Sequence, residues 1–501
     1  MPRNSFMENF CDSILTCKES AEFEADFFKG DVEKELFAMR QASKRIAEII
    51  LGEFGRILEA SPKILVLSGS GHNGGDALGA ALEILNRLPS SKIDVFFTDK
   101  SRLRPNTQKI CGELFSFKNS VFEVSEISGE YDLVLEGLAG MSLKPPLRKG
   151  LERAIVSANA LSAKLKVSVD LPAGMSDEPC GAVFKSDLCV MAGIAKAPLF
   201  NPENRGIAGR LRYADLGFLP NLETKKSIVS ERVLKPLLKL RNVCSDKRSY
   251  GHLFVFAGSR NYAGAALMNV KAAIRSGVGL VSAFVPETLA PSFVAAEPAA
   301  IWIPCPTTED GSLSLETFSL FRERKGKETA VLAGSGLSGN PETLALVSEV
   351  LRHTEAKVVL DADAISKPVI ASAKENRTLI TPHHGEFLRV ARSVDDGGLS
   401  DFSQSSKIAV LLKSELSRIA DGSNFAFNIS GSPILSRAGS GDILAGIAGG
   451  LLARADLDFT PFEAGCAAAF IAGKIAEKAC LKYGENAYSS SCAFDFFREI
   501  F

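Results

Sequence analysis

The sequence predicts an α/β protein with two domains, and the N-terminal one is expected to contain a doubly wound parallel sheet. The chain has 501 residues, which is more than one ordinary hydrophobic core accommodates. Short apolar runs alternate with stretches of helical periodicity, the pattern that places parallel strands side by side. Many of the 42 glycines follow the apolar runs, where strand-to-helix turns require a residue without a side chain.

The first alternation begins with a helical stretch over residues 20–56, in which Met39, Ala42 and Ile46 mark one apolar face. A second helix is predicted over residues 76–88. Short apolar runs predict buried parallel strands at residues 63–68, 93–98, 132–135 and 165–169. Strands and helices in this order indicate a Rossmann-like sheet with helices on both faces.

Between residues 221 and 250 the alternation lapses in a stretch rich in Lys and Arg without a clean strand. We therefore predict one domain over residues 1–225 and a second over residues 226–501. The alternation then restarts with a strand at residues 253–257 and a helix at residues 263–275. Further strands are predicted at residues 280–285, 330–333, 357–360, 378–381 and 408–413, and helices at residues 441–454 and 462–478.

The composition argues against several classes of partner. A net charge of −1 gives no sign of nucleic acid or an anionic membrane as a partner. The ten cysteines form no CxxC pair and the five histidines do not cluster with them, so we expect free thiols in a reducing cytoplasm and no zinc site. We see no signal peptide and no apolar run of the roughly 20 residues that a membrane span needs.

A glycine loop follows the first predicted strand. Residues 69–74 match GxGxxG between a strand and a helix, where glycines let the backbone approach a phosphate and the helix presents free N–H groups to it. A dehydrogenase would also place an acid after the second strand, and Asp99 could serve there. A tight turn without a ligand remains the alternative for this motif alone.

The continuation of this loop is more specific. Residues 71–76, GHNGGD, resemble the GNNGGD loop of the NAD(P)H-hydrate epimerase family, residues 168–174 resemble its SVDxPSG segment, and residues 132–143 resemble its phosphate loop. The resemblance covers about residues 20–220 and implies that Asp170 is catalytic. It further implies a K⁺ ion held by Asn73, Glu136 and Ala173, and a substrate site formed by His72, Asn73, Gly74, Gly75, Asp76, Gly140, Met141, Ser142 and Asp170.

This chain departs from the family pattern at four places: His72 for Asn, Glu136 for Asp, Met141-Ser142 for Thr-Gly, and Ala173 for Ser. Glu136 keeps the negative charge that a K⁺ ion requires, while Ala173 offers only its backbone carbonyl. His72 would be partly charged near an ordinary histidine pKa of about 6.5. We therefore expect altered ion binding and an epimerase activity that rises as the pH falls towards about 6.

In the C-terminal half, residues 438–442 (AGSGD) open a predicted helix. Three small residues there expose backbone N–H groups and form an anion site at the helix N-terminus. Asp442 beside it could take a proton from a substrate hydroxyl during attack on a phosphate. Alternatively, Asp442 only favours the helix dipole, a contribution of about 0.3–1 kcal/mol.

Several segments in order resemble the ADP/ATP-dependent NAD(P)H-hydrate dehydratases, a ribokinase-like family. They are residues 258–266, 334–337, 361–364, 381–387, 413–417 and 438–442. The resemblance implies a ribokinase-like domain with Asp442 as catalytic base, ADP or ATP as co-substrate and Mg²⁺. It implies substrate contacts from Ala265, Gly336, His383 and Asp442, and nucleotide contacts from Lys413, Ser414, Glu415, Leu416, Ser417, Gly439, Ser440 and Gly441. Asp361 and Asp363 are expected in the wall of the site.

Together the two resemblances imply a nicotinamide cofactor repair enzyme. It would epimerise R and S NADHX and NADPHX, the hydrated cofactors, and dehydrate the S epimer to NADH or NADPH, and we expect it to be a homo-oligomer. The alternative is a ribokinase-like small-molecule kinase with a non-catalytic N-terminal binding module. The presence of Asn73, Asp76 and Asp170 at the family's site positions argues against that module.

Overall fold

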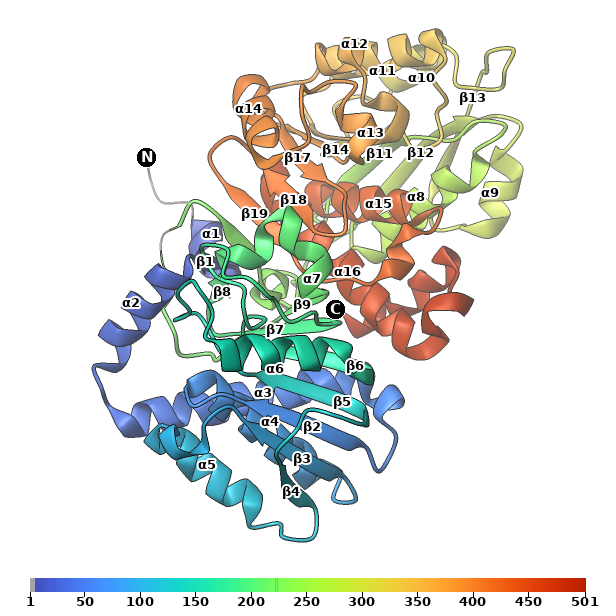
Figure 1. The fold of residues 1–501 in the computed structure, drawn as a ribbon. Coiled ribbons are helices and arrows are strands. Elements are labelled where there is room, and N and C mark those ends of the chain that lie inside the picture. The colour runs from blue at the N-terminus through green and yellow to red at the C-terminus, as the bar shows by residue number, and fades with distance from the viewer. Residues whose placement is uncertain (1–4, 221, 223) are drawn as a thin grey trace. The chain divides into compact units, whose positions relative to one another are not determined.

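The structure, a computed structural model, describes residues 5–220, 222 and 224–501. It contains two compact units (Figure 1). The N-terminal unit comprises Asp12–Thr224, and the C-terminal unit comprises Lys225–Phe501 together with Met1–Cys11 at the start of the chain. In the part of the chain that the structure describes, no helix combines the length and the apolar character that crossing a membrane requires.

The N-terminal unit contains a parallel seven-stranded sheet in the order β4-β3-β2-β5-β6-β7-β9. Its strands are β2 (Lys63–Ser68), β3 (Lys92–Phe97), β4 (Val121–Val124), β5 (Glu130–Gly137), β6 (Ser162–Val169), β7 (Leu188–Ala192) and β9 (Arg210–Ala214). The four predicted strands and the doubly wound arrangement are confirmed. The strand order reverses between β2 and β5, and ligands of such sheets bind beyond the carboxyl ends of the strands at that point.

Alternation along the strands explains why helices cover both faces of this sheet. Ile64 and Val66 of β2 pack in the core formed with α3, α4 and α5, whereas Leu65 and Leu67 point to the opposite face, covered by α6 (Figure 1). The helices are α2 (Cys17–Phe28), α3 (Val32–Leu58), α4 (His72–Arg87), α5 (Pro105–Phe115), α6 (Lys149–Ala160) and α7 (Arg205–Ala208). Two short strands, β1 (Cys11–Leu15) and β8 (Ala195–Lys196), pair in parallel beside this sheet.

In the C-terminal unit the strand order is β13-β12-β11-β14-β15-β16-β17-β18-β19-β10, with antiparallel pairing only at β17-β18-β19. The strands are β10 (Ser227–Val229), β11 (His252–Phe256), β12 (Leu280–Pro286), β13 (Ile301–Cys305), β14 (Ala330–Ala333), β15 (Lys357–Leu360), β16 (Thr378–Ile380), β17 (Ala409–Leu412), β18 (Ser417–Ala420) and β19 (Phe425–Asn428). The expectation of no strand between residues 221 and 250 is wrong, because β10 pairs there with β19. Three residues are too few for a recognisable periodicity.

The helices of this unit are α1 (Ser5–Phe10), α8 (Ala263–Arg275), α9 (Ala290–Ala296), α10 (Thr317–Arg322), α11 (Pro341–His353), α12 (Lys367–Ile370), α13 (His384–Phe387), α14 (Asp396–Ser406), α15 (Ser440–Ala453) and α16 (Pro461–Ala487). Helix α15 lies in the core against α8, α16 and the strands, and its residues from Ile443 to Ala453 are buried. This explains its Gly/Ala-rich sequence, since Gly446 approaches the backbone of Asn269 in α8 too closely for a side chain.

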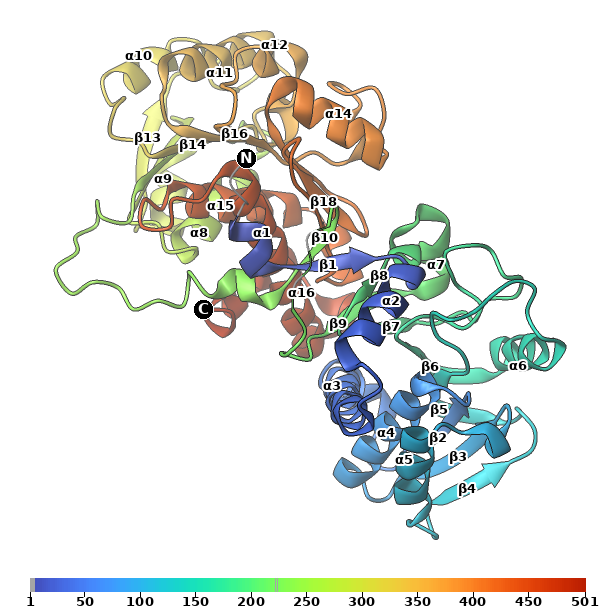
Figure 2. The same cartoon turned by 90° about the vertical axis from the view of Figure 1, so that its left-hand side faces the viewer.

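The start of the chain contributes to the C-terminal core. Phe6 of α1 is 3% exposed and meets Phe459 and Phe462 edge to face, with ring centroids 6.2 and 6.3 Å apart. Figure 2 shows α1 alongside the helices of the C-terminal unit. The predicted domain of residues 1–225 differs from the structure here, because Ser5–Phe10 packs with the C-terminal unit. A short apolar helix does not reveal in sequence which core it joins.

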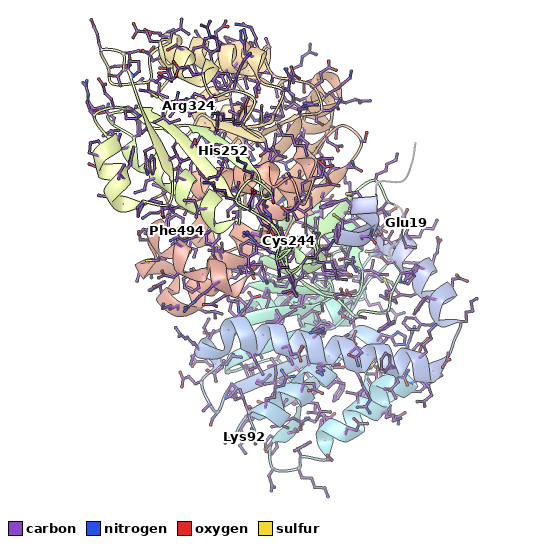
Figure 3. All side chains as sticks on the ribbon, turned by 180° about the vertical axis from the view of Figure 1, so that it is seen from behind. Glu19, Lys92, Cys244, His252, Arg324 and Phe494 are labelled. Atoms are coloured by element: carbon purple, nitrogen blue, oxygen red, sulfur yellow. The ribbon has the colours of Figure 1, made fainter. Side chains whose placement is uncertain are left out.

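One of the five histidines is explained by packing alone. His252, labelled in Figure 3, begins β11, and its ring meets Phe254 edge to face at 4.8 Å. Its Nε2 lies 2.8 Å from the hydroxyl of Ser282. Burial lowers the pKa of His252 to about 4, so this ring is neutral at physiological pH. It lies at the amino end of its strand, opposite to the carboxyl-end loops described next.

Candidate active sites

The helix start at α15 has the geometry of an anion site. Gly439 precedes the helix with a φ of +88°, and a side chain there would lie 2.4 Å from the sulfur of Met268. The Ser440 hydroxyl donates to the Leu435 carbonyl at 2.5 Å, which fixes the loop. The backbone N–H groups that open a 14-residue helix are thereby held in place.

Asp442 in the first turn of α15 lies among charged groups from other loops. The Lys413 ammonium, after β17, is 3.0 Å from Asp361 and 3.8 Å from Glu386. A side chain added at Gly441 would lie 3.4 Å from the same ammonium, which places Lys413 against the helix start. We call Lys413, Asp361, Glu386 and Asp442 the C-terminal charge cluster.

The C-terminal charge cluster shifts the pKa of Asp442, the predicted base. Burial first, and then the charge of Asp361, raise the pKa of Asp442 to about 6, while Lys413 opposes the shift. A carboxyl group with this pKa is largely deprotonated at neutral pH and still accepts a proton readily. The electrostatics therefore suit a general base better than a helix cap.

Asp361, by contrast, accepts side-chain hydrogen bonds on both of its oxygens. Its Oδ1 accepts from the Thr381 hydroxyl at 2.8 Å and from Lys413 at 3.0 Å, and its Oδ2 accepts from the Ser335 hydroxyl at 2.8 Å. The side chain is 3% exposed. Asp361 thus anchors Lys413 and joins three loops. Asp363 takes no part in these hydrogen bonds, and burial raises its pKa.

His383 is the N-cap of α13. Its Nδ1 accepts from the backbone N–H of Gly385 at 3.0 Å and of Glu386 at 3.3 Å. In the neutral ring this leaves the proton on Nε2, which lies 3.3 Å from the Glu386 carboxylate. The side chain is 58% exposed, so the ring combines a capping role with a face open to a ligand.

Two other predicted substrate residues come together at the start of α8. Gly336 has a φ of +66°, and a side chain there would lie 2.9 Å from Cβ of Ala265 and 2.8 Å from the Tyr262 carbonyl. The loop after β14 therefore touches the helix start only because position 336 is glycine. Ala265 and Gly336 form one surface, as the sequence predicts.

The predicted nucleotide segment, residues 413–417, divides into two parts. Ser414 donates to the Leu416 carbonyl at 2.6 Å, Ser417 donates to the Ser414 carbonyl at 3.3 Å, and Leu416 is buried, so these residues form a closed turn before β18. Lys413 belongs instead to the charge cluster. The sequence pattern gave no sign that the first residue of the segment is bound by carboxylates.

In the N-terminal unit the glycine loop packs tightly on the end of β5. A side chain at Gly69 would lie 2.1 Å from the Leu138 carbonyl, and one at Gly74 would lie 2.2 Å from the Gly69 carbonyl. A side chain at Gly137 would likewise lie 2.5 Å from the Asn73 carbonyl oxygen. These glycines are required by close packing, which brings the predicted loops 69–76 and 136–142 together.

The three predicted K⁺ ligands, Asn73, Glu136 and Ala173, lie around this contact. Glu136 is fully buried and accepts from the backbone N–H of Leu138 at 2.7 Å and of Ala173 at 3.1 Å. Burial raises the pKa of Glu136 to about 8, against the effect of these bonds. Asn73 donates to the Ala139 carbonyl at 2.9 Å, while its buried Oδ1 accepts no hydrogen bond from the described residues.

Asp170 follows β6 with a φ of +66°, a left-handed conformation that is uncommon outside glycine. Its Oδ1 accepts from the Lys196 ammonium at 2.5 Å and from the Ala192 backbone at 3.1 Å. Lys196, in β8, is 1% exposed. The sequence reasoning missed Lys196, although a lone lysine within the apolar run 191–200 was a signal that it required a buried partner.

The predictions for His72 and Asp99 need correction. His72 Nε2 lies 3.5 Å from the Glu35 carboxylate and 3.3 Å from the Arg104 guanidinium. Burial first and then Arg104 lower the pKa of His72, so a partly charged imidazole near pH 6.5 is not expected. Asp99 accepts from the backbone and hydroxyl of Ser101 as a turn former, which removes the argument for a dehydrogenase ribose site.

Comparisons with known proteins agree with both halves of the sequence analysis. A family model described as NAD(P)H-hydrate dehydratase matches residues 253–496, and one described as YjeF-related protein N-terminus matches residues 35–197. A bifunctional NAD(P)H-hydrate repair enzyme of Gloeobacter violaceus is 30% identical over 483 residues, which cover 90% of this chain and 91% of the relative. One of Thermosynechococcus vestitus is 29% identical over 464 residues, 88% of this chain and 89% of the relative.

Among solved structures, an ADP/ATP-dependent NAD(P)H-hydrate dehydratase of Bacillus subtilis co-crystallised with ATP/Mg²⁺ is 25% identical. The similarity covers 54% of this chain and 95% of that one, with a TM-score of 0.45. A ribokinase-like superfamily protein of Enterococcus faecalis is 21% identical, covering 56% of this chain and 98% of that one with a TM-score of 0.48.

Proposed function

This chain belongs to the family of bifunctional NAD(P)H-hydrate repair enzymes, and we propose that the two sites described above carry its two activities. The C-terminal unit dehydrates NADHX and NADPHX at the expense of ADP or ATP, and the N-terminal unit interconverts their epimers. Within the family assignment, the position of Asp442 beside the α15 helix start is the observation that supports this site for the dehydratase chemistry.

Dehydration at this site begins as phosphoryl transfer. Asp442 takes the proton of the substrate hydroxyl while the hydroxyl oxygen attacks the terminal phosphorus of the nucleotide. The backbone N–H groups of Gly439, Ser440 and Gly441 stabilise the charge of the transferred phosphoryl group. Phosphate then leaves the ring carbon as the ring nitrogen supplies its electron pair, and loss of a proton from the next carbon restores the dihydronicotinamide. Ala265, Gly336 and His383 contact the substrate.

The turn at residues 413–417 supports the nucleotide, and Mg²⁺ accompanies its phosphates. The described residues contain no group of three His, Cys, Asp or Glu side chains able to hold a metal. Mg²⁺ at nucleotide sites needs only one or two carboxylates besides phosphates and water, so a site without a group of three such side chains is compatible with it. The ion would neutralise charge on the phosphates; Asp361, whose two oxygens already accept hydrogen bonds from Ser335, Thr381 and Lys413, is a poor candidate ligand.

The N-terminal unit suits a K⁺ ion beside the epimerase site. The buried Asn73 Oδ1 without a hydrogen-bond partner, the Glu136 carboxylate and the Ala173 carbonyl supply oxygen atoms where the two loops meet. Such an ion would fix the loops of residues 72–76 and 140–142 around the substrate. Asp170 lies at the carboxyl end of β6 as the group that exchanges a proton with the substrate.

The test is recovery of NADH from mixed NADHX epimers. The purified chain is incubated with the hydrate, with and without ADP or ATP and with Mg²⁺, while absorbance at the NADH band is followed. Two phases are expected: a fast phase from the epimer that is dehydrated directly and a slow phase supplied by epimerisation. A stable phosphorylated product without NADH would instead indicate a small-molecule kinase, and a lack of any nucleotide-dependent reaction would refute the proposal.

We also propose that the protein acts in the cytoplasm as a homo-oligomer on NADHX and NADPHX, without nucleic acid or membrane partners. All ten cysteines are free thiols in the structure; seven are buried, two are partly buried and one, Cys244, is exposed. Free thiols in this number are typical of a reducing compartment. Light scattering of the purified protein measures the oligomeric state.

A further inference from the structure

A group of buried and partly buried ionisable side chains surrounds Asp170, and the family-based site residues include only part of it. Lys196 pairs with Asp170 from β8, while Glu24 of α2 and Asp76 of α4 interact with both electrostatically. We call these four residues the N-terminal charge cluster. Lys196 and Glu24 have no role in the function proposed so far.

The two oxygens of Asp170 differ in their surroundings. Oδ1 accepts two hydrogen bonds, from the Lys196 ammonium at 2.5 Å and the Ala192 backbone at 3.1 Å. Oδ2 accepts none from the described residues, and the side chain retains 12% exposure. The Lys196 ammonium at this distance fixes the rotation of the carboxylate. The free oxygen is therefore a negatively charged acceptor in a set direction.

Asp76 has the opposite environment. Its carboxyl group accepts no hydrogen bond from the described residues, and it lies beyond the first turn of α4, where it caps nothing. Burial first, and then the charges of Asp170 and Glu24, raise the pKa of Asp76 well above its ordinary value, against the effect of Lys196. Two interacting carboxyl groups in such different environments divide into a proton donor and a proton acceptor.

We propose that Lys196 is the positioning residue that holds Asp170 as the proton acceptor of the epimerase site, with Asp76 as its proton donor. The inference rests on the proposed epimerase function. The hydrated carbon bears a hydroxyl and is bonded to the ring nitrogen. Asp170 takes the hydroxyl proton, the carbon–oxygen double bond forms, the carbon–nitrogen bond breaks, and Asp76 protonates the nitrogen. Rotation of the aldehyde and the reverse transfers close the ring with the other configuration.

Other ionisable groups near Asp170 do not provide this division. Cys17 lies beside Asp177, and burial first and then that carboxylate raise the pKa of its thiol to about 12. The Cys189 thiol donates to the Asp170 carbonyl at 3.5 Å, and burial raises its pKa far above neutrality. Glu24, whose pKa burial and Asp170 raise to about 7, is the rival proton donor and has to be tested beside Asp76.

The test follows the slow phase of the two-phase assay in the full-length protein across pH, after subtraction of the enzyme-free epimerisation rate. The wild-type rate should fall at high pH as Asp76, whose pKa is raised in the cluster, is deprotonated. Lys196→Gln removes the charge but keeps a hydrogen-bond donor, so we expect the high-pH limb to move to higher pH and the neutral-pH rate to fall by about 10²-fold. Asp76→Asn should remove the high-pH limb and lower the rate by about 10²–10⁴-fold.

The controls separate positioning from folding. Lys166→Met removes another partly buried lysine of the same unit, one that donates only to the carbonyls of Ala158 and Asn159, and should leave the profile unchanged. Thermal melting identifies unfolded variants, and Asp76→Asn reports independently if Lys196→Gln is among them. An unmoved profile in Lys196→Gln, or loss of the high-pH limb in Glu24→Gln instead of Asp76→Asn, would overturn the inference. An undiminished slow phase in Asp170→Asn would instead refute the epimerase function itself.

Discussion

Each unit pairs a lysine with a buried aspartate at the end of a parallel strand, yet the two pairs differ in what the aspartate can still do. In the C-terminal unit Asp361 accepts hydrogen bonds from Ser335, Thr381 and Lys413, so each of its oxygens already has a partner. In the N-terminal unit Asp170 accepts hydrogen bonds from the Lys196 ammonium and the Ala192 backbone N–H on one oxygen only. A lysine–aspartate pair therefore does not by itself identify a proton acceptor; the unoccupied oxygen does.

The comparison also explains where each unit places its base. The C-terminal unit uses the lysine-bound aspartate as an anchor and keeps the proposed base, Asp442, as a separate carboxyl at a helix start. The N-terminal unit combines anchor and base in Asp170. Phosphoryl transfer requires N–H groups beside the base to stabilise an anion, which a helix start supplies, whereas exchange of a proton with a hydroxyl does not.

The largest expected effect is that of Asp442→Asn. Loss of the general base should lower nucleotide-dependent NADH recovery by about 10²–10⁴-fold, while the backbone N–H groups of the loop remain. Both phases of the assay should fall, since epimerisation is only seen through dehydration. A melting temperature equal to that of the wild type verifies the fold. Near wild-type turnover would make Asp442 a helix-dipole residue and leave the C-terminal unit without its separate base.

A second prediction tests whether the two sites belong to separate units, as the comparison assumes. Phe6→Ala removes a buried ring from the C-terminal core and should destabilise that unit by about 3–5 kcal/mol. A fragment beginning at residue 226 lacks the same ring and should unfold at similarly low denaturant. The single tryptophan, Trp302 of β13, reports unfolding of this unit by fluorescence.

The matched control for Phe6→Ala is Phe501→Ala, because that ring is 36% exposed in the same unit. Its effect should stay within about 1 kcal/mol, as for most partly exposed positions away from the core. If Phe6→Ala left the Trp302 transition unmoved, the start of the chain would not contribute to the stability of the C-terminal unit.

A third prediction concerns the lysine of the C-terminal charge cluster. Lys413→Met leaves Asp361 and Glu386 without their cation, and loss of one partner of a buried pair costs about 3–5 kcal/mol. Ser335 and Thr381 still donate to Asp361, so we expect the lower end of this range. Because Lys413 lowers the pKa of Asp442, its loss should move the low-pH limb of dehydration upward from about 6.

Lys407→Met is the comparison variant for this measurement. Lys407 pairs with Glu375 at 2.7 Å, but its side chain is 55% exposed, and such pairs contribute about 0–1 kcal/mol. Neither the denaturation midpoint nor the pH profile should change appreciably. A low-pH limb that stays in place in Lys413→Met would mean that Lys413 does not act on Asp442.

The features that could be predicted from the sequence are those that depend on residues adjacent in the chain. Strands β2, β14 and β15 and helix α8 have the predicted bounds, because their apolar patterns and flanking glycines are local. The glycine loops and Asp442 were visible for the same reason. Lys196 was missed because its partner, Asp170, lies 26 positions earlier, and only the pairing of distant segments shows that the two charges meet. The placement of Phe6 and the bonds of Lys413 likewise depend on contacts that no local pattern encodes.

The smallest expected effect on rate is that of Asp361→Asn, and its comparison with Asp170→Asn is direct because one substitution is made at both lysine-bound aspartates. Asp170→Asn should stop the slow phase. Asp361→Asn should leave dehydration within about 10-fold of the wild type, since Asp361 positions Lys413 and exchanges no proton. The charge of Asp361 raises the pKa of Asp442, so its removal should let the base stay deprotonated to lower pH and move the low-pH limb below about 6. A loss in Asp361→Asn as large as that in Asp442→Asn would show that occupied oxygens do not exclude an aspartate from proton transfer.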